Sequence, residues 1–467
     1  MSRIAVACLW LCFALAWGSA SAKVFNPTVY KLDNGLQIVV VENHLAPVVT
    51  HMIWYKTGAA DEEQGHSGLA HFLEHLMFKG TPTTPAGEFS KIIARNGGED
   101  NAFTNYDYTA YYQTIRADRL ELVMKLEADR MKNLALTDDQ VYPERDVILE
   151  ERRQRTGNSP EARLSEALRY VLFANSPYGR PVIGWEQEMQ QLTTADAVAW
   201  YRKWYAPGNA VLTVVGDVVP SEVKALAEKY YGPIPAQAVP ERHRAQVAPL
   251  PGADRRVTLR DPDIHQPAFI RYYVAPNYSP KTKKEALALE VFDEIFGSGT
   301  PSRLYQALAV RQKVATSAGS SYNDTAIDLS AIGLYASPAP GKDIADVEKA
   351  IDGEIQRVLK DGVTEQEVAD AKTRLQAAAI LARDSFMGPA FSFGTSLTTG
   401  QDIADVEDWP DNIASVTVAE VNAAIRGVFG PRNISATGWL LPAQGTKAPL
   451  DATQAANTTA PSMGPIR

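Results

Sequence analysis

The order of apolar and polar residues predicts both strands and helices along the chain. Residues 29–42 have the pattern of a β-hairpin that turns at Asp33-Asn34-Gly35, because these residues tolerate a positive φ. Residues 48–56 and 109–115 are rich in β-branched and aromatic side chains, which favour strands. Helical patterns follow at 118–133 and 143–155, the second with Pro143 in its first turn. Strands and helices without strict alternation predict an α+β fold with antiparallel-rich sheets.

A short amphipathic pattern covers residues 67–80, which run from a serine able to cap a helix to a glycine able to end one. Four apolar residues recur at helical spacing and form one face: Leu69, Phe72, Leu73 and Leu76. His71, Glu74 and His75 project from the opposite face. We therefore expect a helix that presents two imidazoles and one carboxylate on its free side.

The length of 467 residues exceeds what one hydrophobic core usually supports, so two domains are expected. A Pro- and Ala-rich linker, 233–252, separates an N-terminal domain, 23–232, from a C-terminal domain, 253–442. Each domain contains an aromatic-small-Pro-x-Asn segment, at 205–209 and 429–433, that leads into a strand-like stretch. This repeat favours two related domains of similar size.

The two ends of the chain have the composition of segments outside the fold. Residues 1–22 combine Arg3, an apolar stretch and the small residues Ala20-Ser21-Ala22, which predicts a signal peptide and secretion across the inner membrane into the periplasm. A retained membrane anchor, or a lipoprotein site at Cys12, fits this segment less well, so no stable membrane anchor is expected. Residues 443–467 are predicted to be disordered.

Charge and cysteine content exclude two classes of function. The formal net charge is −9 and no Lys/Arg-rich run occurs, which argues against a nucleic-acid partner. Both cysteines, Cys8 and Cys12, lie in the predicted signal peptide. Disulfides and thiolate metal ligands are therefore not expected in the mature chain.

The residues of 67–80 predict zinc chemistry. Histidines four residues apart on a helix can bind one metal ion together, and a carboxylate between them can reach a water molecule that zinc has acidified. We therefore expect His71 and His75 to bind zinc and Glu74 to be the catalytic general base. The alternative is a pair of surface or interface histidines.

A third ligand is expected from the helix at 143–155, where Glu144 and Glu151 are seven residues apart and share a face. Glu151 is the preferred third ligand, and Glu144 is expected to orient a ligand histidine. Glu150 is the chief competitor for the ligand role, and solvated glutamates are the alternative.

The order H-x-x-E-H in His71–His75 is the inverzincin signature. With Glu151 downstream, GGEDNAFT at 97–104 and FGSGTPSRLY at 296–305, the chain resembles the pitrilysin and insulinase family of zinc peptidases. It is most similar to the short branch that includes mitochondrial processing peptidase and bacterial relatives.

The resemblance implies one zinc ion per chain, held by His71, His75 and Glu151, and two homologous α+β domains. It also implies a homodimer, or a heterodimer with a related subunit, in which four domains enclose a chamber. Peptide substrates would pair with the edge strand formed by Asn101, Ala102, Phe103 and Thr104, although an ordinary turn would also fit these residues. Residues 285–299, the counterpart of the zinc helix, contain no histidine, so the second domain should bind no metal.

Together these observations predict a zinc-dependent endopeptidase that hydrolyses peptides or unfolded segments. A non-catalytic assembly or core subunit that retains the fold is the main alternative. A zinc-binding protein without hydrolytic activity is a further one.

Overall fold

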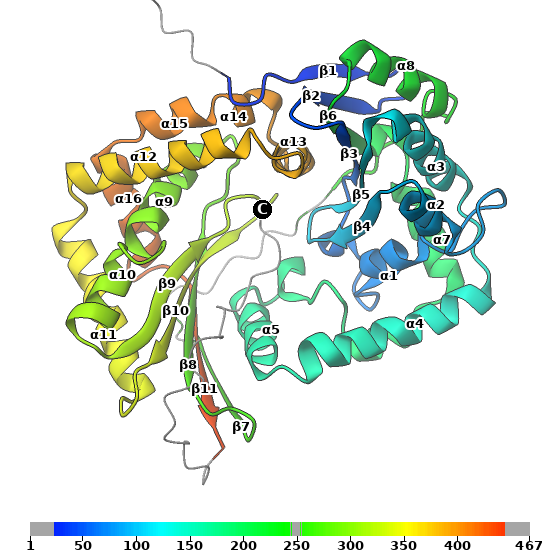
Figure 1. Cartoon of the computed structure of the whole chain (residues 1–467). Helices are drawn as coiled ribbons and strands as arrows, with labels where there is room; N and C mark the ends of the chain where they lie inside the picture. The colour runs from blue at the N-terminus through cyan, green and yellow to red at the C-terminus, as the bar shows by residue number, and fades with distance from the viewer. Residues whose placement is uncertain (1–22, 243, 245–252, 254, 444–467) are drawn as a thin grey trace, which may run out of the picture.

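The computed structural model describes residues 23–242, 244, 253 and 255–443 (Figure 1). Outside these residues lie the predicted signal peptide, the second part of the predicted linker (243 and 245–252) and the predicted tail after Ala443. None of the helices formed by the described residues has the length and apolar character needed to span a membrane.

Six strands form the first sheet, in the spatial order β1-β2-β6-β3-β5-β4. Their bounds are β1 (Thr28–Lys31), β2 (Gln37–Glu42), β3 (Val48–Tyr55), β4 (Glu99–Thr104), β5 (Thr109–Arg116) and β6 (Ala210–Gly216). β1 and β2 are the predicted hairpin, and Gly35 takes a φ of 94° at its turn. β2 and β6 are parallel, whereas the other pairs of this sheet are antiparallel. β4 forms one edge.

The second sheet has the order β7-β11-β8-β10-β9. Its strands are β7 (Arg255–Asp261), β8 (Ala268–Ala275), β9 (Ala315–Tyr322), β10 (Ser330–Pro338) and β11 (Ser435–Pro442). This order matches β2-β6-β3-β5-β4 strand for strand, including one parallel pair, β7 with β11. The two halves therefore repeat one topology, which confirms the predicted α+β fold with two related domains.

The repeated segment at 205–209 and 429–433 marks the same junction in both halves. The Asn209 side-chain amide donates to the carbonyl of Trp204, at 2.9 Å, where a helix ends before β6. The Asn433 amide donates in the same way to the carbonyl of Val428, at 2.6 Å, before β11. In each half this asparagine satisfies a carbonyl of the last helical turn, which intrahelical bonds cannot reach.

Sixteen α-helices, counted over the described residues, accompany the two sheets. The first half contributes α1 (Leu69–Leu76), α2 (Glu88–Arg95), α3 (Leu120–Asn133), α4 (Asp138–Arg152), α5 (Pro160–Leu172), α6 (Glu186–Met189), α7 (Thr194–Trp204) and α8 (Pro220–Tyr230). The second half contributes α9 (Lys283–Phe296), α10 (Arg303–Tyr305), α11 (Ile344–Asp361), α12 (Glu365–Ala382), α13 (Met387–Thr399), α14 (Ile403–Glu407), α15 (Trp409–Ser415) and α16 (Val418–Phe429). Each half buries its own apolar cluster between sheet and helices.

The two halves also exchange helices. α5 precedes the linker in sequence but packs on the second sheet, where Leu168 lies over Gly438 of β11. A Cβ at Gly438 would come within 2.4 Å of that leucine. Conversely, α13 packs on the first sheet, with Gly394 against the indole of Trp54 in β3. In Figure 1 the two sheets face each other across a central space, with α5 and α13 on its borders.

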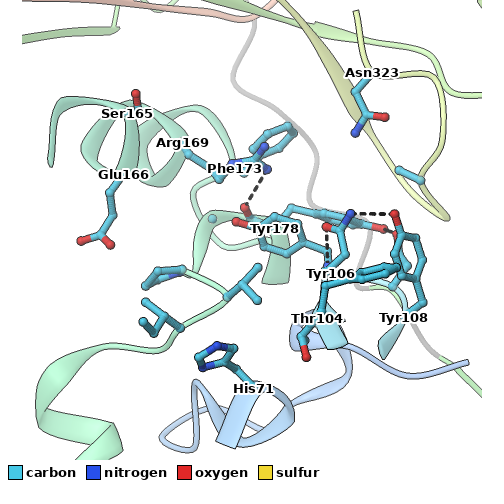
Figure 2. A pocket seen from close by; sticks show the side chains of 18 of the residues that line it. His71, Thr104, Tyr106, Tyr108, Ser165, Glu166, Arg169, Phe173, Tyr178 and Asn323 are labelled. Atoms are coloured by element: carbon cyan, nitrogen blue, oxygen red, sulfur yellow. Dashed lines mark hydrogen bonds between the residues drawn. The ribbon is translucent and has the colours of Figure 1, made fainter. Parts of the chain in front are cut away.

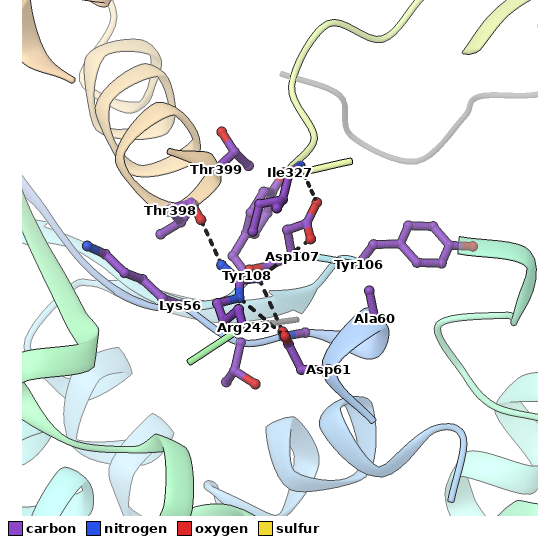
Figure 3. A network of polar contacts seen from close by, with 12 residues as sticks. Lys56, Ala60, Asp61, Tyr106, Asp107, Tyr108, Arg242, Ile327, Thr398 and Thr399 are labelled. Atoms are coloured by element: carbon purple, nitrogen blue, oxygen red, sulfur yellow. Dashed lines mark hydrogen bonds and ion pairs between the residues drawn. The ribbon is translucent and has the colours of Figure 1, made fainter. Parts of the chain in front are cut away.

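A buried ionic cluster, here called the seam network, joins the halves (Figure 3). It consists of Asp61, Asp107, Arg242 and Arg244. Arg242 contacts Asp61 at 3.1 Å and Arg244 contacts Asp107 at 2.7 Å. Asp107 also accepts the backbone N–H of Ile327, in the β9–β10 loop of the second half, at 3.1 Å. The middle of the predicted linker is thus held by ion pairs, although the described linker residues form no helix or strand.

The predicted start of the helix at 143–155 is wrong. α4 begins five residues earlier, at Asp138, where Thr137 and Gln140 form a capping box. Pro143 therefore lies inside the helix and not in its first turn. It leaves the carbonyl of Asp139 without a helical donor, but Asp139 is exposed, so water can satisfy that carbonyl.

Candidate metal centre

The helix that carries the predicted ligands, α1, is shorter than the expected 67–80 and begins differently. Ser67 does not cap it, because its hydroxyl accepts the backbone N–H of Trp185 at 2.9 Å. The carboxylate of Glu62 accepts the N–H groups of Gly68 and Ala70 instead, at 3.0 and 2.8 Å. A buried acid distant by several residues therefore satisfies the first turn, which the local sequence pattern did not reveal.

The two faces of α1 are divided as the hydrophobic pattern predicted. Its apolar residues pack into the first core and are at most 6% exposed: Leu69, Phe72, Leu73 and Leu76. His71, Glu74 and His75 all line a cavity. His71 and Glu74 are only 7% and 8% exposed. The polar face of α1 is thus largely shielded from bulk water.

The structure brings His71, His75 and Glu151 together. Glu151 Oε2, from the last turn of α4, lies 3.8 Å from His71 Nε2 and 3.4 Å from His75 Nε2. Potential ligand atoms of the three side chains all lie within 4.8 Å of one another. Tetrahedral zinc with ligands at about 2.0–2.2 Å holds them roughly 3.3–3.6 Å apart, so the three groups need only small movements to bind one ion.

A buried carboxylate oxygen of this cluster favours a cation site. Glu151 Oε2 is shielded from solvent and has no hydrogen-bond partner. A buried acceptor without a partner costs about 1–3 kcal/mol, and more when it is charged. A divalent cation between the imidazoles and Glu151 would remove the cost at the carboxylate. The residues present therefore fit zinc, which prefers nitrogen and carboxylate ligands in this combination.

Glu144 and Glu150, the glutamates nearest to Glu151 on α4, have different partners. Glu144 Oε1 accepts from His75 Nδ1 at 2.8 Å and Glu144 also pairs with Lys79. This is the orienting contact expected for Glu144, since it fixes which ring nitrogen faces Glu151. Glu150 is exposed and bonds to Arg153 and Gln154 away from the histidines. The geometry thus favours Glu151 over Glu150 as the third ligand.

Without a metal, the pKa values of the two histidines are shifted in opposite directions. Burial lowers the pKa of His71 to about 3, so this imidazole is neutral and available as a ligand. Burial also lowers the pKa of His75, but the contacts with the Glu144 and Glu151 carboxylates outweigh it and raise the pKa to about 9. Cation binding must therefore displace a proton from His75.

Glu74 lies beside the three candidate ligands and is held by the edge strand. Thr104, the last residue of β4, donates its hydroxyl to Glu74 Oε2 at 2.6 Å. Burial raises the pKa of Glu74 to about 7, although the Thr104 hydrogen bond opposes this shift. A carboxyl with such a pKa can accept and return a proton near neutral pH. The contact with Thr104 was not foreseen from the sequence, because it joins residues thirty positions apart.

The predicted substrate strand, Asn101 to Thr104, is part of β4 at the edge of the first sheet, and not an ordinary turn. Its four residues line the same cavity as His71, Glu74 and His75. Phe103 stacks on Phe391 of α13, with ring centroids 5.1 Å apart. The side of β4 opposite β5 has no strand partner among the described residues, so an extended peptide can pair there.

The cavity has a volume of about 760 Å³ and lies between the halves. Its walls are α1, β4, α5 and the loop that connects β9 with β10. Figure 2 shows Arg169 of α5, Phe173 just after that helix and Asn323 of the β9–β10 loop around the space above His71. The individual lining residues of α5 and of the second half were not predicted, because they depend on how the two halves pack.

Comparison with known proteins places this geometry in context. The family model for insulinase (peptidase family M16) matches residues 37–186, and the model for the M16 inactive domain matches residues 191–375. An uncharacterized zinc protease of Mycobacterium tuberculosis is 32% identical over 416 residues, which is 88% of this chain and 92% of that protein.

Two solved structures have a similar fold. A protease from Helicobacter pylori is 28% identical, with a TM-score of 0.81 over 90% of this chain and all of that chain. The first half of the periplasmic protease PqqL from Escherichia coli is 22% identical, with a TM-score of 0.75 over 89% and 92% of the two chains. The second likeness concerns the fold alone.

Proposed function

The chain belongs to the insulinase family of metallopeptidases, M16, and on this premise we propose that it is a zinc-dependent endopeptidase that cleaves peptides or unfolded segments. The observation that carries the proposal is the convergence of His71, His75 and Glu151 beside the buried carboxylate of Glu74. The first three would bind one zinc ion, and Glu74 would be the general base. In the described part of the chain, no second group of this kind occurs.

When bound, zinc supplies a Lewis acid that polarises the scissile carbonyl and acidifies the attacking water. Glu74 accepts a proton from that water and delivers it to the leaving amine. Thr104 keeps the Glu74 carboxylate aimed at the cavity through its hydrogen bond. Glu144 holds the ring of His75 in its ligating orientation.

The substrate would bind as an additional strand along β4. Backbone groups of Asn101 to Thr104 offer hydrogen bonds that do not depend on the side chains of the substrate. A cavity of about 760 Å³ admits an extended peptide but not a folded protein, so unfolded segments fit it best. We further propose a dimer, with itself or with a related subunit, that closes this space into a chamber. A periplasmic location is proposed from the signal-peptide pattern of residues 1–22.

The test is to purify the mature chain, measure bound zinc, and assay cleavage of an unfolded protein and of quenched fluorescent peptides. The expected result is one zinc per chain and cleavage that stops on chelation and returns with added zinc. Glu74→Gln should keep its zinc and lose cleavage. A wild type that binds zinc but cleaves nothing, alone or with a related subunit, would instead favour a non-catalytic core subunit.

A further inference from the structure

The carboxylates that line the cavity around α5 and the ligand helix already have ionic partners. Glu151 pairs with Arg155 at 2.9 Å. Glu166 of α5 accepts two hydrogen bonds from Arg152, at 3.0 and 2.8 Å. Asp107 is paired within the seam network. These acids are therefore largely neutralised and leave little negative charge to attract a basic substrate.

Arg169 of α5 is the exception among the charged groups of this wall. It lines the cavity and is half-buried. Within the described ranges no carboxylate lies within 4.0 Å of its guanidinium, whereas Arg152, Arg155 and Arg163 nearby each have one. The wall thus carries a positive charge without an ionic partner in the described structure.

The guanidinium of Arg169 is held in place by neutral groups. It lies 4.7 Å from the ring centroid of Tyr106 and 5.5 Å from that of Phe173. One of its nitrogens donates to the carbonyl of Tyr178 at 3.4 Å (Figure 2). These contacts orient the side chain but do not neutralise it. An arginine has five N–H donors in a planar fork, so donors remain for a planar carboxylate from the cavity.

The position of Arg169 relates it to the proposed substrate strand. Tyr106, on which the guanidinium lies, follows Thr104 by two residues, and Thr104 contacts Glu74. Two residues of extended chain span about 6–7 Å. A peptide that pairs with β4 and reacts beside Glu74 therefore brings a group within two or three residues of the scissile bond near Arg169.

We propose that Arg169 is a specificity-determining residue that binds a carboxylate of the substrate, either an acidic side chain near the cleaved bond or a nearby C terminus. This inference rests on the proposed function, since it names the substrate class of the same site. The alternative role for Arg169 is purely structural, as a cation stacked on Tyr106 and Phe173.

The test compares peptides that differ in one carboxylate. A quenched fluorescent parent peptide with neutral side chains receives Glu, or Gln as its match, at each of the three positions on either side of the cleaved bond. At one position wild type should prefer Glu to Gln in kcat/KM by about tenfold, the lower end for a hydrogen bond between charged groups. The ratio should fall to about one in Arg169→Met and be partly kept in Arg169→Lys. Loss of the ratio in both variants would point to the structural role.

Arg163→Met is the matched control, because Arg163 lies on the same helix but pairs with Asp261. It should keep the wild-type ratio. To identify the source of the carboxylate, a peptide without acidic residues is compared with a free and an amidated C terminus. Loss of the preference on amidation assigns the C terminus, whereas dependence on Glu alone assigns a side chain. The inference is overturned when neither carboxylate matters, or when the preference survives in Arg169→Met.

A second readout does not need cleavage. Fluorescence anisotropy with the Glu74→Gln protein gives the Kd of each Glu and Gln peptide, with and without Arg169→Met. A tenfold preference for Glu that disappears with Arg169→Met supports the inference even when wild type cleaves nothing, so that only the proposed function fails. Cleavage without any preference for a carboxylate, in rate or in Kd, leaves the proposed function standing and overturns the inference.

Discussion

Two helices have the same place in the repeated topology, α1 after β3 in the first half and α9 after β8 in the second. Each presents a buried carboxylate to a hydroxyl of the edge strand. Glu74 of α1 accepts from Thr104 in β4, and Asp293 of α9 accepts from Ser320 in β9. Burial raises the pKa of both acids, to about 7 and about 6. A tie between helix and edge strand is thus common to both halves and does not by itself indicate catalysis.

The side chains around the two acids differ. His71 and His75 stand three residues before and one after Glu74, and the same positions around Asp293 are Glu290 and Glu294. The helix that packs across α1 brings a carboxylate to the histidines, whereas α12 brings Arg374 to Glu294, at 2.5 Å.

The proposed catalytic half therefore differs from the other half in the charges of these side chains, whereas the order of the matching strands is the same. In the first half, His71, His75 and Glu151 leave a place for a cation once His75 has lost its proton. In the second half, a guanidinium already neutralises a carboxylate. Four predictions test this comparison, from the largest effect on cleavage to the smallest.

The largest effect is expected from Glu151→Gln, with Glu150→Gln as the matched control. Loss of a carboxylate ligand should lower zinc affinity by more than the roughly 10–100-fold that loss of an outer partner costs, and cleavage should fall with it. Glu150→Gln should retain wild-type zinc content and rate, because Glu150 faces solvent. Zinc titration with a competing chelator and the peptide assay measure both. The reverse result would assign the third ligand to Glu150.

A smaller loss is expected from Glu144→Gln. This change weakens the acceptor for His75 Nδ1 and removes the ion pair with Lys79. Zinc affinity should fall by roughly 10–100-fold while saturating zinc restores most of the rate. Glu294→Gln, which breaks the ion pair with Arg374 in the other half, is the control and should leave zinc affinity unchanged. An equal loss in both variants would mean that general destabilisation causes the effect.

A fall of about tenfold in kcat is expected from Thr104→Val, because this change removes a hydrogen bond to a charged group. The Thr104 hydroxyl lowers the pKa of Glu74, so its removal raises that pKa. Glu74 must be ionised to act as a base, and the acid limb of the kcat/KM profile should therefore move to higher pH. Ser320→Ala, the counterpart at Asp293, should leave the profile in place. An unshifted profile in Thr104→Val would separate Thr104 from the proton transfer.

The sequence predicted those features that depend on local periodicity. The spacing of four apolar residues on α1 placed His71, Glu74 and His75 on one face, and Asp33-Asn34-Gly35 marked the first hairpin. These patterns report on residues that are neighbours along one helix or strand. The same reasoning failed at Ser67, because the carboxylate of Glu62 satisfies the start of α1. It also failed at Pro143, because α4 begins five residues earlier.

The rest of the site arises from packing between segments far apart in the sequence. The contact of Thr104 with Glu74, the exchange of α5 with α13 and the position of Arg169 all require the relative placement of two sheets. The periodicity of apolar residues within one helix or strand does not indicate how two sheets are placed relative to each other. The shared face of Glu144 and Glu151 and the family resemblance favoured Glu151 over Glu150, but the two lie on the same helical turn and only the fold decides which one faces α1.

The smallest effect on cleavage, none beyond about twofold, is expected from Asp293→Asn, since this acid belongs to the half without histidines. Its effect should appear in stability. Burial raises the pKa of Asp293 from 3.8 to about 6, so on acidification the folded state binds a proton before the unfolded state does. This group therefore stabilises the wild type as pH falls from 7 to 5, by about 1 kcal/mol. The asparagine of the variant cannot titrate. In urea unfolding, the free energy of unfolding of the variant minus that of the wild type should therefore be about 1 kcal/mol smaller at pH 5 than at pH 7. A constant difference between variant and wild type would mean that Asp293 is ionised in the folded state at both pH values, and the likeness between the two buried acids would then be one of position only.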